Sequence, residues 1–140
     1  MKREILFRGK SIDNNEWLEG YYVGDNTLVK TEDMMYDLGY IDVSRCHECY
    51  SESIGQFTGL TDKNGKKIFE GDILRSTFEY DGKKREIIGV VEDDNCNPCF
   101  VIHYKYEGNG FDCYEYDFVQ CGLRTNEVIG NIYDNKELLK

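Results

Sequence analysis

Two pairs of cysteines are the residues whose type and spacing could do chemistry. Each pair has the C-x-x-C pattern, and the pairs are Cys46 with Cys49 and Cys96 with Cys99. Thiolates at this spacing on two turns bind Zn²⁺ in structural zinc ribbons, so these four sulfurs are a candidate metal site. However, 46 residues separate Cys49 from Cys96, whereas compact ribbons use about 15 to 20. Cys113 and Cys121 belong to no such pair, and free cysteines often pack as small apolar residues. We therefore favour packing and expect no cofactor, with zinc as the alternative.

The residues of the chain give little support for acid-base or redox catalysis. His47 and His103 are the only histidines, and a histidine inside a strand-like apolar run is typical of a structural residue. Thioredoxin-type cysteine pairs lie at the N-terminus of a helix, and no helical pattern follows Cys46. The G-x-S-x-G, H-E-x-x-H and P-loop motifs are absent. We expect that the chain is not an enzyme and has no catalytic residues.

The formal charge of −10 comes from 27 acidic and 17 basic residues, which are unevenly distributed. A basic cluster between residues 61 and 85 is the candidate partner-binding surface, and it consists of Lys63, Lys66, Lys67, Lys83, Lys84 and Arg85. These side chains flank two predicted hairpin turns, whose tips could stand side by side and grip one anionic partner. Lysines are also common at turns simply because turns are solvated. Since the rest of the chain is acidic and repels phosphate, we do not expect general nucleic-acid binding.

Short strands separated by turns predict an all-β fold. The predicted strands are residues 4–9, 16–23, 27–31, 55–60, 68–74, 75–80, 86–92, 100–106, 111–120 and 127–133. Asn64-Gly65 fits a type I′ turn, and Asp81-Gly82 predicts a second hairpin. Residues 32–53 have no clear period and predict a loop with one short strand at 40–43. This pattern indicates a β-roll or partly open barrel with an N-terminal β-meander and minimal helix.

The segment Glu70-Gly71-Asp72 has the composition of a ligand clamp, but we expect it to be scaffold. Gly71 can supply a backbone bend, and Asp72 can accept hydrogen bonds from nearby loop N–H groups. A groove lined by Phe57 and Phe69 is an alternative place for a partner.

The run GQFTGLTDKNGKKIFEGDI at residues 55–73 is the most distinctive stretch of the chain. It closely resembles the signature of the YopX family of phage and prophage proteins, G-Q-[YF]-T-G-L-x-D-K-N-G-K-x-I-[YF]-E-G-D-I. Residues 3–10 and 127–135 support the resemblance near the two ends. The resemblance implies a β-rich fold related in part to SH3-like barrels, and an origin in a mobile genetic element. It implies no known activity.

The leading hypothesis is a non-enzymatic phage or prophage accessory protein that binds a host or phage protein. The chain begins without the apolar run of roughly 7 to 15 residues found in signal peptides, and it has no apolar segment near the ~18 residues that span a bilayer. We therefore expect a cytoplasmic location in the bacterial host and no membrane partner. Exposed edge strands make a homo-oligomer a further hypothesis.

Three other functions fit the same sequence. The chain could be a small-molecule or nucleotide-binding sponge, a zinc-stapled structural module or an acidic DNA mimic. Its length suits a single domain over residues 1–140. Within that domain, a β subregion at residues 1–45 would pack on a barrel at residues 54–134.

Overall fold

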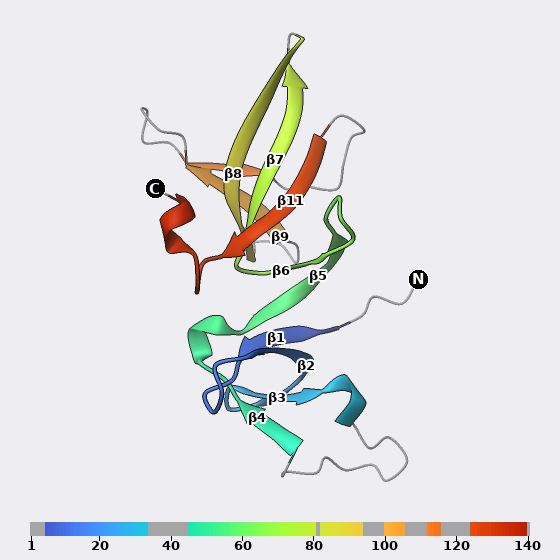
Figure 1. The fold of residues 1–140 in the computed structure, drawn as a ribbon, viewed down its shortest axis with the longest axis vertical. Coiled ribbons are helices and arrows are strands. Elements are labelled where there is room, and N and C mark those ends of the chain that lie inside the picture. Colours follow the sequence, from blue (N-terminus) through green and yellow to red (C-terminus); the bar gives the residue numbers. More distant parts are fainter. Residues whose placement is uncertain are drawn as a thin grey trace. The chain divides into compact units, whose positions relative to one another are not determined.

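The computed structural model describes residues 5–33, 45–80, 82–93, 100–105, 112–115 and 124–139. These residues form antiparallel β-strands joined by turns and short 3₁₀ helices, which confirms the all-β prediction (Figure 1). The strands are β1 (Phe7–Lys10), β2 (Trp17–Gly24), β3 (Thr27–Lys30), β4 (Cys46–Glu48), β5 (Gly55–Thr61), β6 (Lys67–Phe69), β7 (Asp72–Tyr80), β8 (Lys83–Asp93), β9 (Phe100–Lys105), β10 (Asp112–Glu115) and β11 (Arg124–Asn131). The 3₁₀ helices are η1 (Thr31–Asp33), η4 (Ser51–Ser53) and η5 (Lys136–Leu139).

The chain divides into two compact units, Met1–Phe57 and Thr58–Lys140. Strand β5 belongs to both, because Gly55 and Gln56 pair with β1 in the first unit and its later residues lie in the second. The expectation of a single domain with a subregion at residues 1–45 stays a prediction.

In the first unit β1, β2 and β3 form the predicted meander, and β4 adds a fourth strand, so that the four pair in chain order. Its core contains Leu18, Leu28 and Cys49, with Phe7 and Ile54 packed against them. The sheet curls until Ser11, just after β1, forms an antiparallel bridge with Cys49, just after β4. This bridge brings the two ends of the meander together without closing a barrel among the described residues.

The turn between β2 and β3 has type I′ geometry, which the sequence predicts instead for Asn64-Gly65. Asp25 and Asn26 have positive φ values of 50° and 57° and separate the paired residues Gly24 and Thr27. Two consecutive left-handed residues define a type I′ turn, which Asp and Asn tolerate.

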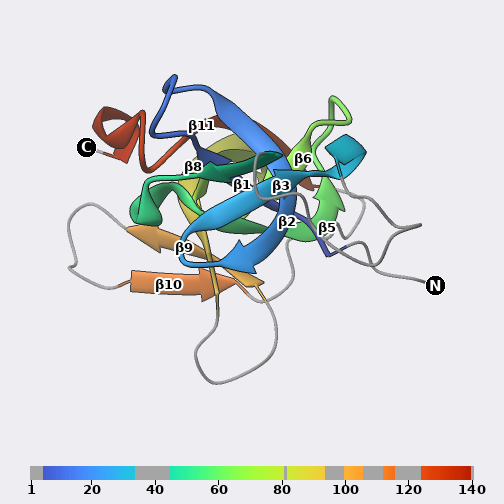
Figure 2. The ribbon, with the colours of Figure 1, turned by 90° about the horizontal axis from the view of Figure 1, so that it is seen from below.

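The second unit contains a five-stranded antiparallel sheet in the order β10-β9-β8-β7-β11. Strands β7 and β8 form its long central hairpin, with β11 beside β7 (Figure 1) and β9 and β10 side by side at the opposite edge (Figure 2). Side chains of β7 and β8 pack on β6, and the buried cluster consists of Ile68, Leu74 and Val91. Leu60, Ile87 and Val128 extend this core.

Two sequence predictions are corrected by the backbone. The strand predicted for residues 68–74 is broken after Phe69, because Glu70 and Gly71 form a turn in which Gly71 has a φ of 90°. Strand β4 lies inside the segment predicted as a loop, since three residues are too few to show an alternating pattern. The short strand predicted at residues 40–43 lies outside the described residues.

Candidate functional site

The hairpin between β5 and β6 carries the middle of the distinctive run and is tightly bonded within itself. Asp62 N–H donates to the carbonyl of Lys66 at 2.8 Å, and Gly65 N–H donates to the carbonyl of Asp62 at 3.0 Å. Gly65 has a φ of 81°, whereas Asn64 is not among the residues with positive φ. The loop is therefore three residues long, with one left-handed glycine, and the type I′ prediction for Asn64-Gly65 is wrong.

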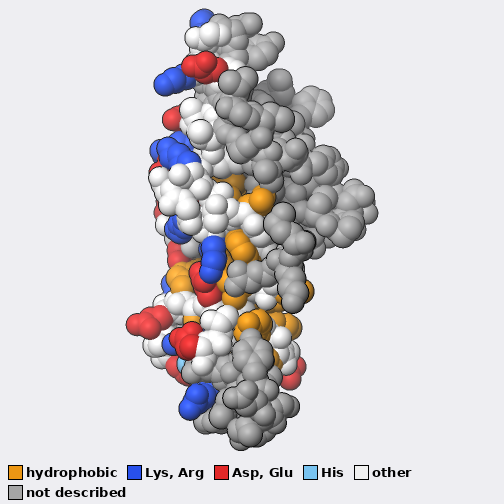
Figure 3. Space-filling model, turned by 90° about the vertical axis from the view of Figure 1, so that its right-hand side faces the viewer, with side chains coloured by type: hydrophobic (Ala, Val, Ile, Leu, Met, Phe, Trp, Pro, Cys, Tyr) orange, Lys and Arg blue, Asp and Glu red, His pale blue; other side chains and the backbone are white. Residues whose placement is uncertain are grey.

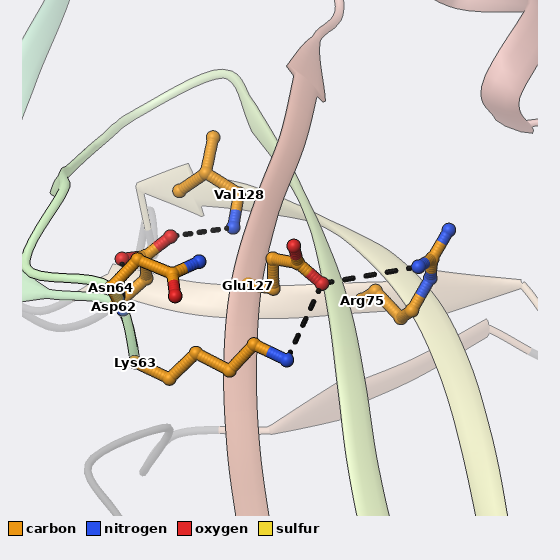
Figure 4. A network of polar contacts seen from close by, with 6 residues as sticks. All are labelled: Asp62, Lys63, Asn64, Arg75, Glu127 and Val128. Atoms are coloured by element: carbon orange, nitrogen blue, oxygen red, sulfur yellow. Dashed lines mark hydrogen bonds and ion pairs between the residues drawn. The ribbon is translucent and has the colours of Figure 1, made fainter.

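The carboxylate of Asp62 is the centre of this hairpin (Figure 4). Its Oδ1 accepts hydrogen bonds from the backbone N–H groups of Asn64 and Lys66, each at 2.9 Å. Its Oδ2 accepts a bond from the N–H of Val128, which lies 66 residues away in the sequence, at 3.0 Å. Only 7% of Asp62 is exposed. One buried side chain thus shapes the loop and joins it to β11.

The hairpin also provides hydrogen-bond partners for backbone groups on the outer edge of β11. Besides the bond from Val128 to Asp62, the N–H of Lys63 donates to the carbonyl of Asn126 at 3.0 Å. On its other side β11 pairs with β7, with Asn126 opposite Ser76 and Val128 opposite Leu74. Unpaired edge strands attract other chains, and here the hairpin covers part of that edge.

The pKa of Asp62 reflects two opposing effects. Burial is the larger single effect and raises the pKa, because it removes water from the charged form. The hydrogen bonds from Val128, Lys66 and Asn64, with the nearby charge of Lys66, lower it. Together these contacts outweigh burial, so the pKa lies below the ordinary value of 3.8, and Asp62 is ionised at neutral pH.

Two ion pairs that share Glu127 lie beside the contacts between Asp62 and β11. Glu127 Oε2 lies 3.6 Å from Lys63 Nζ and 3.9 Å from Arg75 Nη1. All three side chains are partly exposed, so each pair stabilises the fold by at most about 1 kcal/mol. Their main effect is on charge, because Glu127 partly neutralises the cation that Lys63 brings to the tip.

The structure places the two groups of basic residues at separate positions. Lys63 bonds to Asn126, which is opposite Ser76, whereas Lys83 is opposite Tyr80 at the far end of the β7–β8 hairpin. Along β7, Ser76 and Tyr80 are four residue steps apart, or ~13 Å at about 3.3 Å per step. Lys66, Lys83 and Lys84 are exposed and Lys67 is half-buried; the side chain of Arg85 lies outside the described residues. On the face drawn in Figure 3, Lys and Arg side chains stand among Asp and Glu side chains.

The segment Glu70-Gly71-Asp72 forms the bend that the sequence predicts. Phe69 N–H donates to Asp72 Oδ2 at 2.8 Å. Gly71 N–H donates to the carbonyl of Val91 at 2.8 Å, and its own carbonyl accepts a bond from Ile132 N–H at 2.9 Å. These contacts join β6, β8 and the residues after β11, as expected of scaffold.

Cys46 and Cys49 lie on extended backbone instead of the expected turn. Residues three apart on a strand face opposite sides, and Cys49 is buried beside Leu18 and Leu28 whereas Cys46 is half-buried. A Cβ on Gly9 would lie 2.9 Å from Cys49 Sγ, so the sulfur fills a space that only glycine leaves open. Burial, followed by the charge of Glu48, raises the pKa of the Cys49 thiol. Zinc binding through this pair would require Cys49 to leave the core.

The other proposed ligands and histidines give no further site within the described residues. The other two proposed ligands, Cys96 and Cys99, lie outside them. His47 is half-buried on β4, and the backbone of His103 is opposite Val90 on β9. Among the side chains that the structure describes, no three His, Cys, Asp or Glu residues gather as metal ligands would. No helix in the described part of the chain is long and apolar enough to span a bilayer.

The sequence did not single out Asp62, which is one of 27 acidic residues in the chain. A local signal was present, since an Asp two residues before a turn Asn often accepts that residue's N–H. The contact with Val128 had no such signal, because it depends on where β11 pairs.

Replacing Asp62 by Asn should destabilise the protein by about 1.5 to 3 kcal/mol, the usual range for a hydrogen-bonded buried charge. The amide nitrogen introduced by this substitution would face backbone N–H donors, so at least one contact is lost. Urea unfolding of Asp62→Asn measures this. The matched control is Asp25→Asn, an exposed turn position where we expect a change within about 0.5 kcal/mol. Equal stability of both variants would refute the role of Asp62.

The stability of the wild type should also fall in acid. Because folding lowers the pKa of Asp62, its contribution is fully present above the unfolded pKa and is lost as the pH drops through the folded value. The gap in unfolding free energy between wild type and Asp62→Asn should therefore shrink as the pH falls below 3.8. Urea titrations at neutral pH and at successive lower values test this, and a constant gap would contradict it.

Replacing Cys49 by Ser should destabilise the protein by about 1 to 3 kcal/mol, because a hydroxyl would enter an apolar core. Cys46→Ser should change the unfolding free energy by less than about 0.5 kcal/mol. Both are measured by urea unfolding with and without a zinc chelator. If chelation destabilised the wild type and removed the difference between the variants, the cysteines would be metal ligands instead.

Comparison with known proteins identifies the family of this chain. The comparison with curated proteins found no match. Among solved structures, the chain is similar to the crystal structure of protein EF1440 from Enterococcus faecalis, with 23% identity, a TM-score of 0.49, and coverage of 99% of this chain and 100% of that chain. A family model described as YopX protein matches residues 6–140. Because that match spans nearly the whole sequence, the chain belongs to the YopX family.

Proposed function

We propose that this protein is a non-enzymatic accessory protein of a phage or prophage, which acts in the bacterial cytoplasm by binding another protein. The proposed contact is the tip of the β5–β6 hairpin, defined as Lys63 to Lys67. One observation carries this proposal: the buried carboxylate of Asp62 holds the tip in one conformation against β11.

A tip that is already ordered is suited to recognition. Binding costs free energy when a loop must be ordered, and a loop that is rigid beforehand avoids that cost. Lys66 is exposed at this tip, while its backbone N–H and carbonyl are both used inside the hairpin. The backbone is thus fixed, and the charged side chain faces solvent.

The charge of the tip favours a compact acidic protein surface over nucleic acid. At physiological ionic strength, charges more than about 8 Å apart are largely screened, so a small acidic patch responds mainly to the tip lysines. DNA carries a charge every ~1.7 Å and would extend beyond the tip over the acidic remainder of the chain, because the net charge of the whole chain is −10 even with the tip lysines included.

Two features of the structure argue against an enzyme and against a nucleotide sponge. Asp62 accepts three backbone hydrogen bonds, which leaves this buried carboxylate poorly placed to act as a general base. A nucleotide sponge would need lysines of both hairpin tips around one phosphate group, and their separation of ~13 Å along β7 does not favour this.

The proposal predicts that neutralising the tip weakens partner binding. Wild-type protein and the double variant Lys66→Gln, Lys67→Gln are immobilised and exposed to lysate of a bacterial host, and retained proteins are identified by mass spectrometry. A protein retained by the wild type should be lost or reduced about tenfold with the variant, which corresponds to roughly 1.4 kcal/mol.

The matched control is the double variant Lys83→Gln, Lys84→Gln, which removes the same charge from the other hairpin. It should retain the partner. Circular dichroism confirms that both variants are folded. Equal retention by all three proteins would exclude the tip as the contact, and retention of no protein by the wild type would count against the proposed function.

A further inference from the structure

The tip of the β5–β6 hairpin contains a dipeptide with chemistry of its own, Asn64-Gly65. Both residues are exposed, and a Cβ placed on Gly65 would meet no atom within 4 Å. The side-chain amide of Asn64 and the backbone nitrogen of Gly65 belong to adjacent residues and can join in a five-membered ring. Glycine does not hinder that reaction, because it has no side chain.

We propose that Asn64 is a deamidation site whose reaction rate is controlled by the Asp62 carboxylate. The Gly65 nitrogen attacks Cγ of Asn64, a new N–Cγ bond forms, and the side-chain nitrogen leaves as ammonia. Water then opens the resulting succinimide at one of its two carbonyls. Opening at one gives aspartate with the original backbone, and opening at the other gives isoaspartate. The reaction consumes one water and releases one ammonia for each asparagine converted.

The folded hairpin opposes this reaction. Gly65 N–H donates to the carbonyl of Asp62 at 3.0 Å, and Asn64 N–H donates to Asp62 Oδ1 at 2.9 Å. The nitrogen that must attack is therefore engaged in the turn, and both N–H groups that flank the Asn64 side chain are held by hydrogen bonds to Asp62. Attack requires the loop to open, and opening breaks the contacts of the Asp62 carboxylate.

Conversion changes both charge and geometry at the tip. Aspartate at position 64 adds a negative charge two residues from the Asp62 carboxylate, between Lys63 and Lys66. Isoaspartate also adds one backbone atom to a loop whose ends are fixed by the bond between Asp62 and Lys66. Both products weaken the hydrogen bond by which Asp62 holds the hairpin to Val128 on β11. Any effect on partner binding would rest on the proposed function, whereas the reaction itself does not.

The test compares deamidation at two positions of the same chain. Full-length wild type and Asp62→Ala are incubated at mildly alkaline pH, digested and analysed by mass spectrometry for the replacement of NH₂ by OH. Asn109-Gly110, the other Asn-Gly pair, serves as an internal reference. We expect the rate at Asn64 to rise roughly tenfold or more in Asp62→Ala, because local opening becomes easier, with no change at Asn109.

The wild type provides a second measurement that does not depend on the variant. Its Asn64 should deamidate more slowly in native buffer than in urea at the same pH. Equal rates in buffer and urea would overturn the proposal, as would an unchanged rate at Asn64 in a folded Asp62→Ala. Equal acceleration at both asparagines would indicate global unfolding and would also contradict control by Asp62. Partner binding is not part of the readout, so failure here is separable from failure of the proposed function.

Discussion

The second unit, Thr58–Lys140, depends on the hydrogen bonds that the buried carboxylate of Asp62 accepts. The donors are three backbone N–H groups, two from its own loop and one from Val128 on β11. A carboxylate with only 7% of its surface exposed would destabilise the fold without these donors. The loop and the strand edge are therefore fixed by the same two oxygen atoms.

This contact links the surface of the protein to its core. Val128 packs against the cluster of Ile68, Leu74 and Val91, while its N–H reaches the hairpin. Gly71 supplies a second link, since its backbone bonds to Val91 and Ile132. The basic tip is consequently an extension of the packed sheet, and its position follows from core packing. The first unit is stabilised differently: Cys49 fills the space beside Gly9, and a bridge between Ser11 and Cys49 joins the two ends of the meander.

The turns and strands were largely predictable because their signals are local. Glycine, asparagine and aspartate marked the hairpins, and alternation marked the longer strands. The errors arose where local signals were ambiguous: Asn64-Gly65 fits two loop types, and the bond from Gly65 to Asp62 selects the longer one. Strand β4 is defined by pairing with β3, not by its own three residues. The basic residues could be recognised, but the pairing of Lys63 with Glu127 and the distance between the tips depend on the register of β7 with β8 and β11.

Amide hydrogen exchange of Val128, followed by NMR, tests the central role of Asp62 most directly. The N–H of Val128 points away from β7, so without the hairpin it would lie at an open sheet edge. The structure predicts that this amide is strongly protected and that Asp62→Ala removes its protection together with that of Lys66, while Leu74 in the sheet interior stays protected. Rapid exchange at Val128 in the wild type, or protection unchanged by the variant, would contradict the account.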